Sequence, residues 1–433
     1  MAKGLFLPFK EATKAMEQKS AAPQKTVIAG LCCPGLPEED SSDERSLEEL
    51  AALVDTAGGQ VVARVLQNRP TPEARTFLGE GKAREIAELV RNAGAELLVL
   101  DNDVSPAQTR ALSDLCDCAV LTRSGIILDI FAGRARTAEG KLQVELAQYK
   151  YLLPRLSGQG AAMSRLGGGI GTRGPGETKL ETDRRHIRAR MEHLEREIDH
   201  LSSVRETQRQ QRLHNEIPVV ALVGYTNAGK STLMNRLTDA CIPARNRLFD
   251  TLDTTTRAFE PEEGIPALLS DTVGFIRRLP HALISSFAAT LSELKYAELL
   301  LHVIDASDPE MEAHIRVTES LIEQLARPET RVLRVYNKSD LLPADAVEDP
   351  EGIYISAADG RGVEELLGRI AEALRGTRRT YRLLIPYADG AALNRLYRDG
   401  RVASAEHTES GVLVCATCDA KLFASVADYV IKE

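Results

Sequence analysis

Tryptophan is absent from this chain of 433 residues, and aromatic residues make up only 4% of it. The hydrophobic cores should therefore consist mainly of leucine, isoleucine, valine and alanine. No apolar run approaches the ~18 residues that a membrane-spanning helix requires, and charged residues interrupt the first twenty positions, which argues against a signal peptide. Seven scattered cysteines do not suggest a disulfide framework. We therefore expect a soluble, cytoplasmic and monomeric protein with no membrane span.

Positive charge is also scarce overall, since 54 Lys/Arg stand against 63 Asp/Glu and the net charge is −9. This balance argues against a non-specific nucleic-acid binder. The charge is nevertheless segregated, because Arg134–Arg190 contains 12 basic and 5 acidic residues. A basic segment in an acidic chain is typical of a surface that meets a polyanion, although a solvated helix pair rich in arginine fits the charge equally well.

The periodicity of apolar residues divides the chain into five parts. Residues 1–25 are polar and are expected to form a mobile tail. Residues 26–136 alternate strand and helix patterns, as in a small α/β domain, and residues 137–215 predict long helices. Residues 216–378 predict a mostly parallel sheet with helices on both faces. Residues 379–433 predict a further small α/β unit.

Within residues 26–136, the patterns predict strands at Thr26–Leu31, Gln60–Leu66 and Glu96–Leu100. Helices are expected at Leu47–Val54, at Lys82–Asn92, and from Ser105-Pro106 to Cys116. Ser46 and Glu49 fit a capping box that opens the first helix, and Ser105-Pro106 supplies an N-cap followed by an N1 proline. The turn Gly79–Lys82 resembles a phosphate-binding turn, but it lacks P-loop spacing and is better interpreted as a helix start.

Two helical stripes predict an antiparallel hairpin or short coiled coil in residues 137–215. The first consists of Leu142, Leu146, Tyr149 and Leu153, and the second of Ile187, Met191, Leu194, Ile198 and Leu201. Residues 165–177 between them hold six glycines and two arginines. Glycines let a backbone approach folded RNA, and arginines can meet its phosphates and 2′-hydroxyls; the alternative is a connection without function. The expected RNA contacts are Arg165, Gly167, Gly168, Gly169, Gly171, Arg173, Gly174 and Gly176.

A phosphate-binding motif opens the third region. Gly224–Ser231, Gly-Tyr-Thr-Asn-Ala-Gly-Lys-Ser, fits G-x-x-x-x-G-K-[ST] directly after an expected strand and before a helical pattern. Its glycines let backbone N–H groups face phosphates, Lys230 neutralises the β and γ oxygens, and Ser231 ligates Mg²⁺. In Asp271-Thr-Val-Gly274, Asp271 can hold Mg²⁺ through water and the Gly274 amide can meet the γ-phosphate.

Two further motifs indicate guanine. In Asn337-Lys-Ser-Asp340, an aspartate carboxylate can accept both N1–H and N2–H₂ of guanine, a donor pair that adenine lacks, while Asn337 can reach the base edge and the Lys338 stem can pack on its face. Backbone amides of Ser356-Ala-Ala358 can touch O6. All four motifs end expected strands, where open α/β sheets bind ligands. The nucleotide contacts predicted from them are Gly224, Tyr225, Thr226, Asn227, Ala228, Gly229, Lys230, Ser231, Asp271, Thr272, Val273, Gly274, Asn337, Lys338, Ser339, Asp340, Ser356, Ala357 and Ala358.

The switch segments leave two questions open. A Mg²⁺-ligating threonine should lie between the P-loop helix and Asp271, in the segment expected to form the first switch. This segment contains four candidates, and its composition does not show which of them is the ligand: Thr251, Thr254, Thr255 and Thr256. Many GTPases place a water-orienting glutamine directly after the Asp-x-x-Gly motif, where this chain has Phe275. A phenyl ring cannot orient water, so intrinsic hydrolysis should be slow. A partner or a second-switch residue, Arg277 or His281, must complete the site, although His281 is better interpreted as an ordinary loop histidine.

The chain resembles the HflX family of ribosome-associated GTPases over roughly residues 26–375. The segments that carry the resemblance are Leu128–Phe131, Arg134–Arg136, Gly140–Leu146, Gly167–Thr178, Leu180–Arg185, Gly224–Ser231, Asp271–Arg277 and Leu279–His281. The family pattern Phe-Ala-Thr-Leu-Asp lies over Phe249–Asp253, with Asp250 in place of a small residue and Thr254 in place of proline. It selects Thr251 as the ligand and adds as nucleotide contacts Phe249, Asp250, Thr251, Leu252 and Asp253.

The resemblance implies a GTPase that binds the large ribosomal subunit and its ribosomal RNA, and that dissociates stalled or idle ribosomes. Hydrolysis of GTP to GDP would be stimulated by the ribosome and would control release. Catalytic roles are then expected for Lys230, Thr251 and Gly274, with Mg²⁺ on Ser231 and Thr251. A signalling switch with a protein partner on the hairpin is one alternative. An RNA-remodelling enzyme is another, but it would need a second active site.

Overall fold

The computed structural model describes residues 23–37, 41–156, 175–214, 217–238, 248–249, 255–263, 265–278, 294–328, 330–343, 349–350, 352–375, 378–408 and 410–431. The chain divides into two compact units, Met1–Gly133 with Ala147–Arg190, and Arg134–Leu146 with Met191–Glu433. Nearly all of the expected tail, residues 1–22, lies outside the described residues. No helix in the described ranges has both the length and the apolar composition to cross a membrane.

The N-terminal sheet is fully parallel, within the small α/β domain that the alternating pattern predicts. Its strands follow the order β2-β1-β3-β4, and buried side chains such as Val27, Ile86 and Leu98 form its core. A four-residue strand that runs directly into a helix gives no turn signal, so β4 and α5 were not predicted from the sequence. The elements are β1 (Gln24–Cys32), α2 (Glu44–Thr56), β2 (Gly59–Asn68), α3 (Glu80–Ala93), β3 (Leu97–Leu100), α4 (Pro106–Cys116), β4 (Ala119–Thr122) and α5 (Arg123–Arg134).

Helix termini confirm one capping prediction and correct another. Ser105 caps α4 in a capping box with Gln108, and Pro106 is the first helical residue. The box predicted at Ser46 and Glu49 is wrong, because α2 begins at Glu44 and the Asp43 side chain accepts the N–H of Ser46. Tertiary contacts occupy both residues instead. The Ser46 hydroxyl donates to Asp101, and Glu49 pairs with Arg123. Gly79 stands at the N-cap of α3, as expected of a helix start.

Two helices follow, α6 (Ala138–Arg155) and α8 (Pro175–His214). The predicted stripe of α8 is borne out: Leu194 is buried, and Ile187, Met191, Ile198 and Leu201 are half-buried among mostly exposed charged residues. The predicted stripe of α6 is likewise borne out, since Leu146 is buried and Leu142, Tyr149 and Leu153 are half-buried. The buried face is wider than that stripe and also includes Glu139, Gly140, Gln143, Val144, Ala147 and Tyr151. Because α8 begins at Pro175, Gly176 lies in its first turn and not in a loop.

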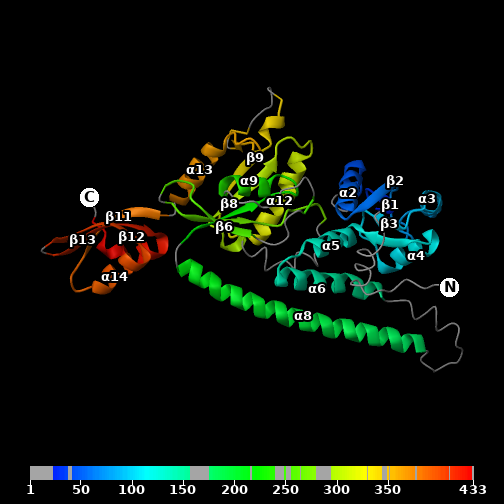
Figure 1. Cartoon of the computed structure of the whole chain (residues 1–433), viewed down its shortest axis with the longest axis horizontal. Helices are drawn as coiled ribbons and strands as arrows, with labels where there is room; N and C mark the ends of the chain where they lie inside the picture. Colours follow the sequence, from blue (N-terminus) through cyan, green and yellow to red (C-terminus); the bar gives the residue numbers. More distant parts are fainter. Residues whose placement is uncertain are drawn as a thin grey trace. The chain divides into compact units, whose positions relative to one another are not determined.

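The third region forms a six-stranded sheet in the order β10-β9-β8-β5-β7-β6. Figure 1 labels β6, β8 and β9 of this sheet. The sheet is parallel except for β6, which runs antiparallel to β7. Threonine-rich and half-exposed, β6 lacks the apolar run that predicted the other strands. The elements are β5 (Val219–Val223), α9 (Lys230–Thr238), β6 (Thr255–Phe259), β7 (Ala267–Asp271), β8 (Leu299–Asp305), α12 (Met311–Leu325), β9 (Arg331–Asn337), η2 (Ser339–Leu341), β10 (Ile353–Tyr354) and α13 (Val363–Arg375).

The C-terminal residues form a small α/β unit with an antiparallel sheet, in the order β11-β13-β12. Alternate side chains of the central strand, including Val412 and Val414, are buried against residues such as Leu396. The elements are β11 (Arg378–Ile385), α14 (Gly390–Asp399), β12 (Arg401–Thr408), β13 (Gly411–Asp419), α15 (Ala420–Val426) and η3 (Ala427–Tyr429). The expected α/β class of the whole chain is therefore confirmed.

Candidate nucleotide-binding site

The P-loop connects β5 to α9 and depends on two glycines. Gly224 has φ of +152° and Gly229 has φ of +95°, values that favour glycine. A Cβ on Gly224 would collide with the backbone carbonyl of Val303 in β8, and one on Gly229 would collide with the side-chain amide of Asn337. The loop is therefore held directly against two neighbouring segments at the carboxyl edge of the sheet, as its motif predicts.

Lys230, the first residue of α9, is almost completely buried. Its Nζ donates to the carbonyl oxygens of Gly224 at 2.9 Å and Tyr225 at 2.8 Å, and only 5% of the residue is exposed. Burial lowers the pKa of Lys230 to about 8, against the opposing effect of Asp271. Phosphate oxygens would restore the stability of the charged form, so this amine is suited to an anionic ligand.

Ser231 and Asp271, which are expected to hold Mg²⁺, are joined by a hydrogen bond. The Ser231 hydroxyl donates to Oδ2 of Asp271 at 2.9 Å, and Asp271 ends β7 with 1% exposure. Hydroxyl and carboxylate oxygens are the ligands that Mg²⁺ prefers. The residues therefore fit a Mg²⁺ ion bound by Ser231, with Asp271 acting through water. The threonine predicted as the second ligand, Thr251, lies outside the described residues.

Residues 274–277 of the second switch are hydrogen-bonded to the P-loop. The Thr226 N–H donates to the carbonyl of Phe275 at 2.7 Å, and the Phe275 N–H donates to the carbonyl of Gly224 at 3.1 Å. Phe275 is 1% exposed. A Cβ on Gly274 would lie 2.9 Å from Cγ2 of Thr226 and 3.1 Å from Nζ of Lys230. Gly274 therefore packs directly on the residues that should meet the terminal phosphate.

In the Asn-Lys-Ser-Asp segment, the Asn337 side chain makes two hydrogen bonds within the protein. Its predicted contact with the base edge stays a prediction. Nδ2 of Asn337 donates to the carbonyl of Ala228 at 2.8 Å and its Oδ1 accepts the N–H of Ala357 at 2.9 Å. Both functional groups of the amide are thereby used to hold the P-loop to residues 356–358. Asp340, in η2, is exposed, and its predicted contact with guanine stays a prediction.

Neighbouring residues also bond the other segments that are predicted to contact the base, Lys338 and residues 356–358. Lys338 adopts a φ of +63°, and its Nζ pairs with Oδ2 of Asp305 at 2.5 Å. Ser356 and Ala357 donate their amides to Arg361 and Asn337, so the expected contact from these two amides to guanine O6 is not available in this conformation. Arg236 of α9 donates to the carbonyls of Ala357 and Ala358.

Several predicted residues lie outside the described ranges. They are the first-switch residues Asp250, Thr251, Leu252, Asp253 and Thr254, the second-switch residue His281, and the loop residues Arg165, Gly167, Gly168, Gly169, Gly171, Arg173 and Gly174. Phe249, at the start of the first switch, is described; it is 2% exposed and has φ of +55°. Roles for the other residues remain predictions.

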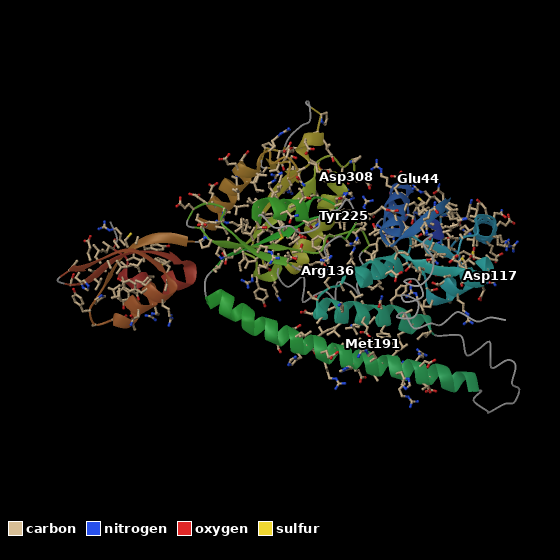
Figure 2. All side chains as sticks on the ribbon, viewed as in Figure 1. Glu44, Asp117, Arg136, Met191, Tyr225 and Asp308 are labelled. Atoms are coloured by element: carbon tan, nitrogen blue, oxygen red, sulfur yellow. The ribbon has the colours of Figure 1, made fainter. Side chains whose placement is uncertain are left out.

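The sequence did not predict a cluster beside the P-loop. The ring of Tyr225 stacks on His314 of α12 at a centroid distance of 3.7 Å, and Nδ1 of His314 lies 3.3 Å from Oδ2 of Asp308. Figure 2 labels Tyr225 and Asp308 within this region. Nearby, burial together with Arg334 and Lys230 lowers the pKa of His302 to about 4. These contacts join positions far apart in the sequence, so no local motif could have indicated them.

Three family models match successive parts of the chain: "GTP-binding GTPase N-terminal" at residues 44–132, "GTP-binding GTPase Middle Region" at 134–212, and "50S ribosome-binding GTPase" at 219–338. A GTP-binding protein from Sulfolobus solfataricus, solved with GDP, covers 81% of this chain and 98% of its own at 21% identity and a TM-score of 0.42. A likeness at this level carries no argument about function.

Curated relatives are much more similar. GTPase HflX of Caldanaerobacter subterraneus is 46% identical over 381 residues, which are 88% of this chain and 89% of the relative. GTPase HflX of Escherichia coli is 44% identical over 363 residues, covering 82% and 85% of the two chains. With its phosphate-binding and guanine-recognition motifs at one edge of a six-stranded sheet, this chain belongs to the HflX family of GTPases.

Proposed function

We propose that this GTPase binds the large ribosomal subunit, separates the subunits of stalled or idle ribosomes, and is released after hydrolysis. The observation that carries the enzymatic part is the arrangement of Lys230, Ser231 and Asp271 at the end of β5 and β7. The family model named for 50S ribosome binding, matched at residues 219–338, supports the choice of partner. The basic segment Arg134–Arg190 agrees with an RNA-rich partner.

The chemistry is cleavage of the bond between the β- and γ-phosphates of GTP by water. Lys230 would neutralise the β and γ oxygens, the Gly274 amide would bind the γ-phosphate, and Asp340 would accept guanine N1–H and N2–H₂. Ser231, Asp271 and the predicted Thr251 would hold Mg²⁺. When bound, that ion neutralises charge that develops on the phosphates.

Phe275 explains why a partner is needed. Its buried phenyl ring occupies the position that follows the Asp-x-x-Gly motif and offers no group that can orient a water molecule. Intrinsic turnover should therefore be slow. The ribosome would accelerate it by completing the site, and hydrolysis would then weaken the switch contacts that hold the protein on the subunit.

The test is GTP turnover at ~0.1 M salt, with and without purified large subunits, because phosphate contacts weaken steeply with salt. We expect stimulation of at least ~10-fold, loss of turnover in Ser231→Ala, and loss of stimulation when residues 165–174 are shortened. Such a deletion leaves α8, which begins at Pro175, intact. Sedimentation of 70S ribosomes would report splitting.

Slow turnover that subunits do not change, together with no co-sedimentation in a non-hydrolysable GTP analogue, would contradict the ribosomal partner. A protein partner of the hairpin would then become the better hypothesis. Absence of any GTP turnover, even with subunits, would contradict the enzymatic assignment itself.

A further inference from the structure

A small polar cavity lies beside the P-loop, between β8 and α12. The centre of a water molecule has about 10 Å³ of space in it, which suits an ordered water and is too little for an organic ligand. Figure 2 labels two of the residues that line the cavity, Tyr225 and Asp308. The other polar residues of its lining are Thr226, His302, Asp305, His314 and Thr318.

Two polar atoms of this lining have no hydrogen-bond partner within the described residues. They are Nδ1 of His302 and Oγ1 of Thr226. The two residues are only 1% and 6% exposed, so bulk solvent does not supply the missing partner. Because an unsatisfied polar atom in a protein interior is costly, such atoms are normally bonded to an ordered water. The cavity therefore offers two of the hydrogen-bonding groups that a buried water needs.

The other polar side chains of the lining are bonded to different groups of the protein. Thr318 donates its hydroxyl to the carbonyl of His314 at 2.9 Å. Oδ2 of Asp308 lies 3.3 Å from Nδ1 of His314, and Oδ2 of Asp305 pairs with Nζ of Lys338. These contacts leave the His302 nitrogen and the Thr226 hydroxyl to be satisfied by another molecule.

The charge around His302 favours a neutral ligand over a cation. Burial, Arg334 and Lys230 together lower the pKa of His302 to about 4, so its imidazole is neutral at physiological pH. The same two positive charges oppose a metal ion at this place. Each ring nitrogen of a neutral imidazole either donates or accepts a hydrogen bond, depending on the tautomer. Water can do both and therefore satisfies Nδ1 in either case.

We propose that this cavity binds a buried water molecule that bridges Nδ1 of His302 and the hydroxyl of Thr226, and that His302 is thereby a positioning residue of the P-loop. Thr226 packs on the second switch, since its N–H donates to the carbonyl of Phe275 at 2.7 Å and its Cγ2 lies 2.9 Å from the site of a Cβ on Gly274. By holding the hydroxyl in the cavity, the water keeps Thr226 in the rotamer that directs its methyl group toward Gly274.

A crystal structure of the full chain tests the water directly. We expect density for one water molecule within about 3 Å of both Nδ1 of His302 and Oγ1 of Thr226. The density should be lost in His302→Leu, which places an apolar side chain in the same space. A direct hydrogen bond between the two wild-type side chains, a metal ion identified by its anomalous scattering, or a cavity without density would overturn the water site.

GTP turnover with large ribosomal subunits tests the positioning role. Thr226→Val preserves the shape of the side chain and removes its hydroxyl, and His302→Leu removes Nδ1. Each change is expected to lower kcat about fivefold, the effect of one hydrogen bond, while KM for GTP changes less than about twofold. The double variant should lose about as much as either single variant, because both substitutions remove the same bridge.

Two further variants separate the hydroxyl from the shape of the side chain. Thr226→Ser keeps the hydroxyl, so His302→Leu should still lower kcat about fivefold in that background. The matched control is Thr238→Val, which removes a hydroxyl that donates to the carbonyl of Met234 at 2.8 Å within α9. Its effect should simply multiply with that of His302→Leu. A thermal melt of each variant establishes that it is folded.

The two measurements fail in different ways. Multiplied effects of Thr226→Val and His302→Leu in folded variants would overturn the positioning role. The expected change in turnover rests on the proposed function of this site, whereas the density for the water does not. A wild-type chain that hydrolyses no GTP, even with large subunits, would overturn the proposed function and leave the crystal structure to decide the water site.

Discussion

The N-terminal sheet and the GTPase sheet are both built from parallel strands, and both gather polar side chains where those strands end. In the N-terminal sheet, the Asp101 carboxylate accepts hydrogen bonds from Ser42 at 2.6 Å, Ser46 at 2.5 Å and Arg123 at 2.8 Å. Asp101 and Arg123 are each 1% exposed. In the GTPase sheet, by contrast, Asp340 remains exposed, and Lys230 takes its contacts from two backbone carbonyls.

The difference separates two uses of the same architecture. Asp101 is opposed by a fixed guanidinium and two hydroxyls of its own domain, so its negative charge is already compensated. Lys230 is a buried cation whose lowered pKa reports incomplete compensation. The first edge therefore stabilises the fold, whereas the second is arranged for an anion that the chain does not itself supply.

The largest effect that tests this comparison is expected from Asp101→Ala. Removal of one partner leaves the buried Arg123 without its central carboxylate and should cost about 3–5 kcal/mol of stability, with unchanged GTP turnover in molecules that remain folded. Urea unfolding of the full chain measures the loss in the free energy of unfolding, and hydrogen exchange in β1 and β3 assigns it to the N-terminal sheet. Asp103→Ala, at the neighbouring exposed position, is the control. A turnover defect in folded Asp101→Ala would show that the first edge is not merely structural.

The converse change is Lys230→Ala, which should lower GTP turnover by roughly 100-fold or more in molecules that remain folded, because it removes a charge that acts on the transition state. Steady-state phosphate release measures the effect. Turnover within about threefold of wild type would mean that Lys230 does not meet the phosphates.

One buried asparagine in each sheet, Asn102 and Asn337, allows a direct test of the difference between the two sheet edges. Asn102 bonds the N–H and carbonyl of Leu31 at 2.8 and 3.2 Å, just as Asn337 bonds Ala228 and Ala357. Replacing either with alanine removes two buried hydrogen bonds and should cost about 2 kcal/mol of stability. Only Asn337→Ala should also weaken GDP binding, measured by calorimetry. Equal nucleotide affinity in the two variants would contradict the role assigned to Asn337.

The smallest effect concerns pH. The free protein loses the Lys230 proton near pH 8, whereas phosphates keep the bound form protonated, so binding takes up a proton above that value. Nucleotide affinity should be constant below about pH 8 and fall up to about tenfold per unit above it. Binding titrations between pH 7 and 9.5 measure the slope, and Lys230→Met supplies the control that should lack it. A nucleotide affinity that rises with pH above pH 8 would contradict this prediction.

Local patterns predicted the parts of the fold that depend on local physics. The P-loop could be located because Gly224 and Gly229 need positive φ and Lys230 must open a helix, all within eight residues. The stripe on α8 and the N-cap at Ser105 have the same local origin. At other positions, tertiary contacts gave a residue a different role from the one that its local sequence predicted. Ser46 could have capped a helix, but Asp101 holds its hydroxyl.

The nucleotide site likewise combines features that local sequence patterns predict with contacts that they do not. The prediction of a guanine nucleotide follows from residue types in four short motifs. The hydrogen bonds of Asn337, in contrast, involve Ala228 and Ala357, which lie 109 and 20 residues away in the sequence. The Tyr225–His314 stack likewise joins the P-loop to α12. No spacing rule in a single sequence reports such pairs, because each partner alone has an ordinary local environment.

The contact between Gly229 and Asn337 has a consequence for inhibitor design. Since the amide of Asn337 fills the space that a side chain on Gly229 would take, the phosphate-binding loop and the base-recognition edge cannot move independently. A compound that displaces Asn337 to gain a base-side pocket would also disturb the phosphate loop. Fragments for the two halves of this site should therefore be screened together, because the affinity of each will depend on the occupancy of the other.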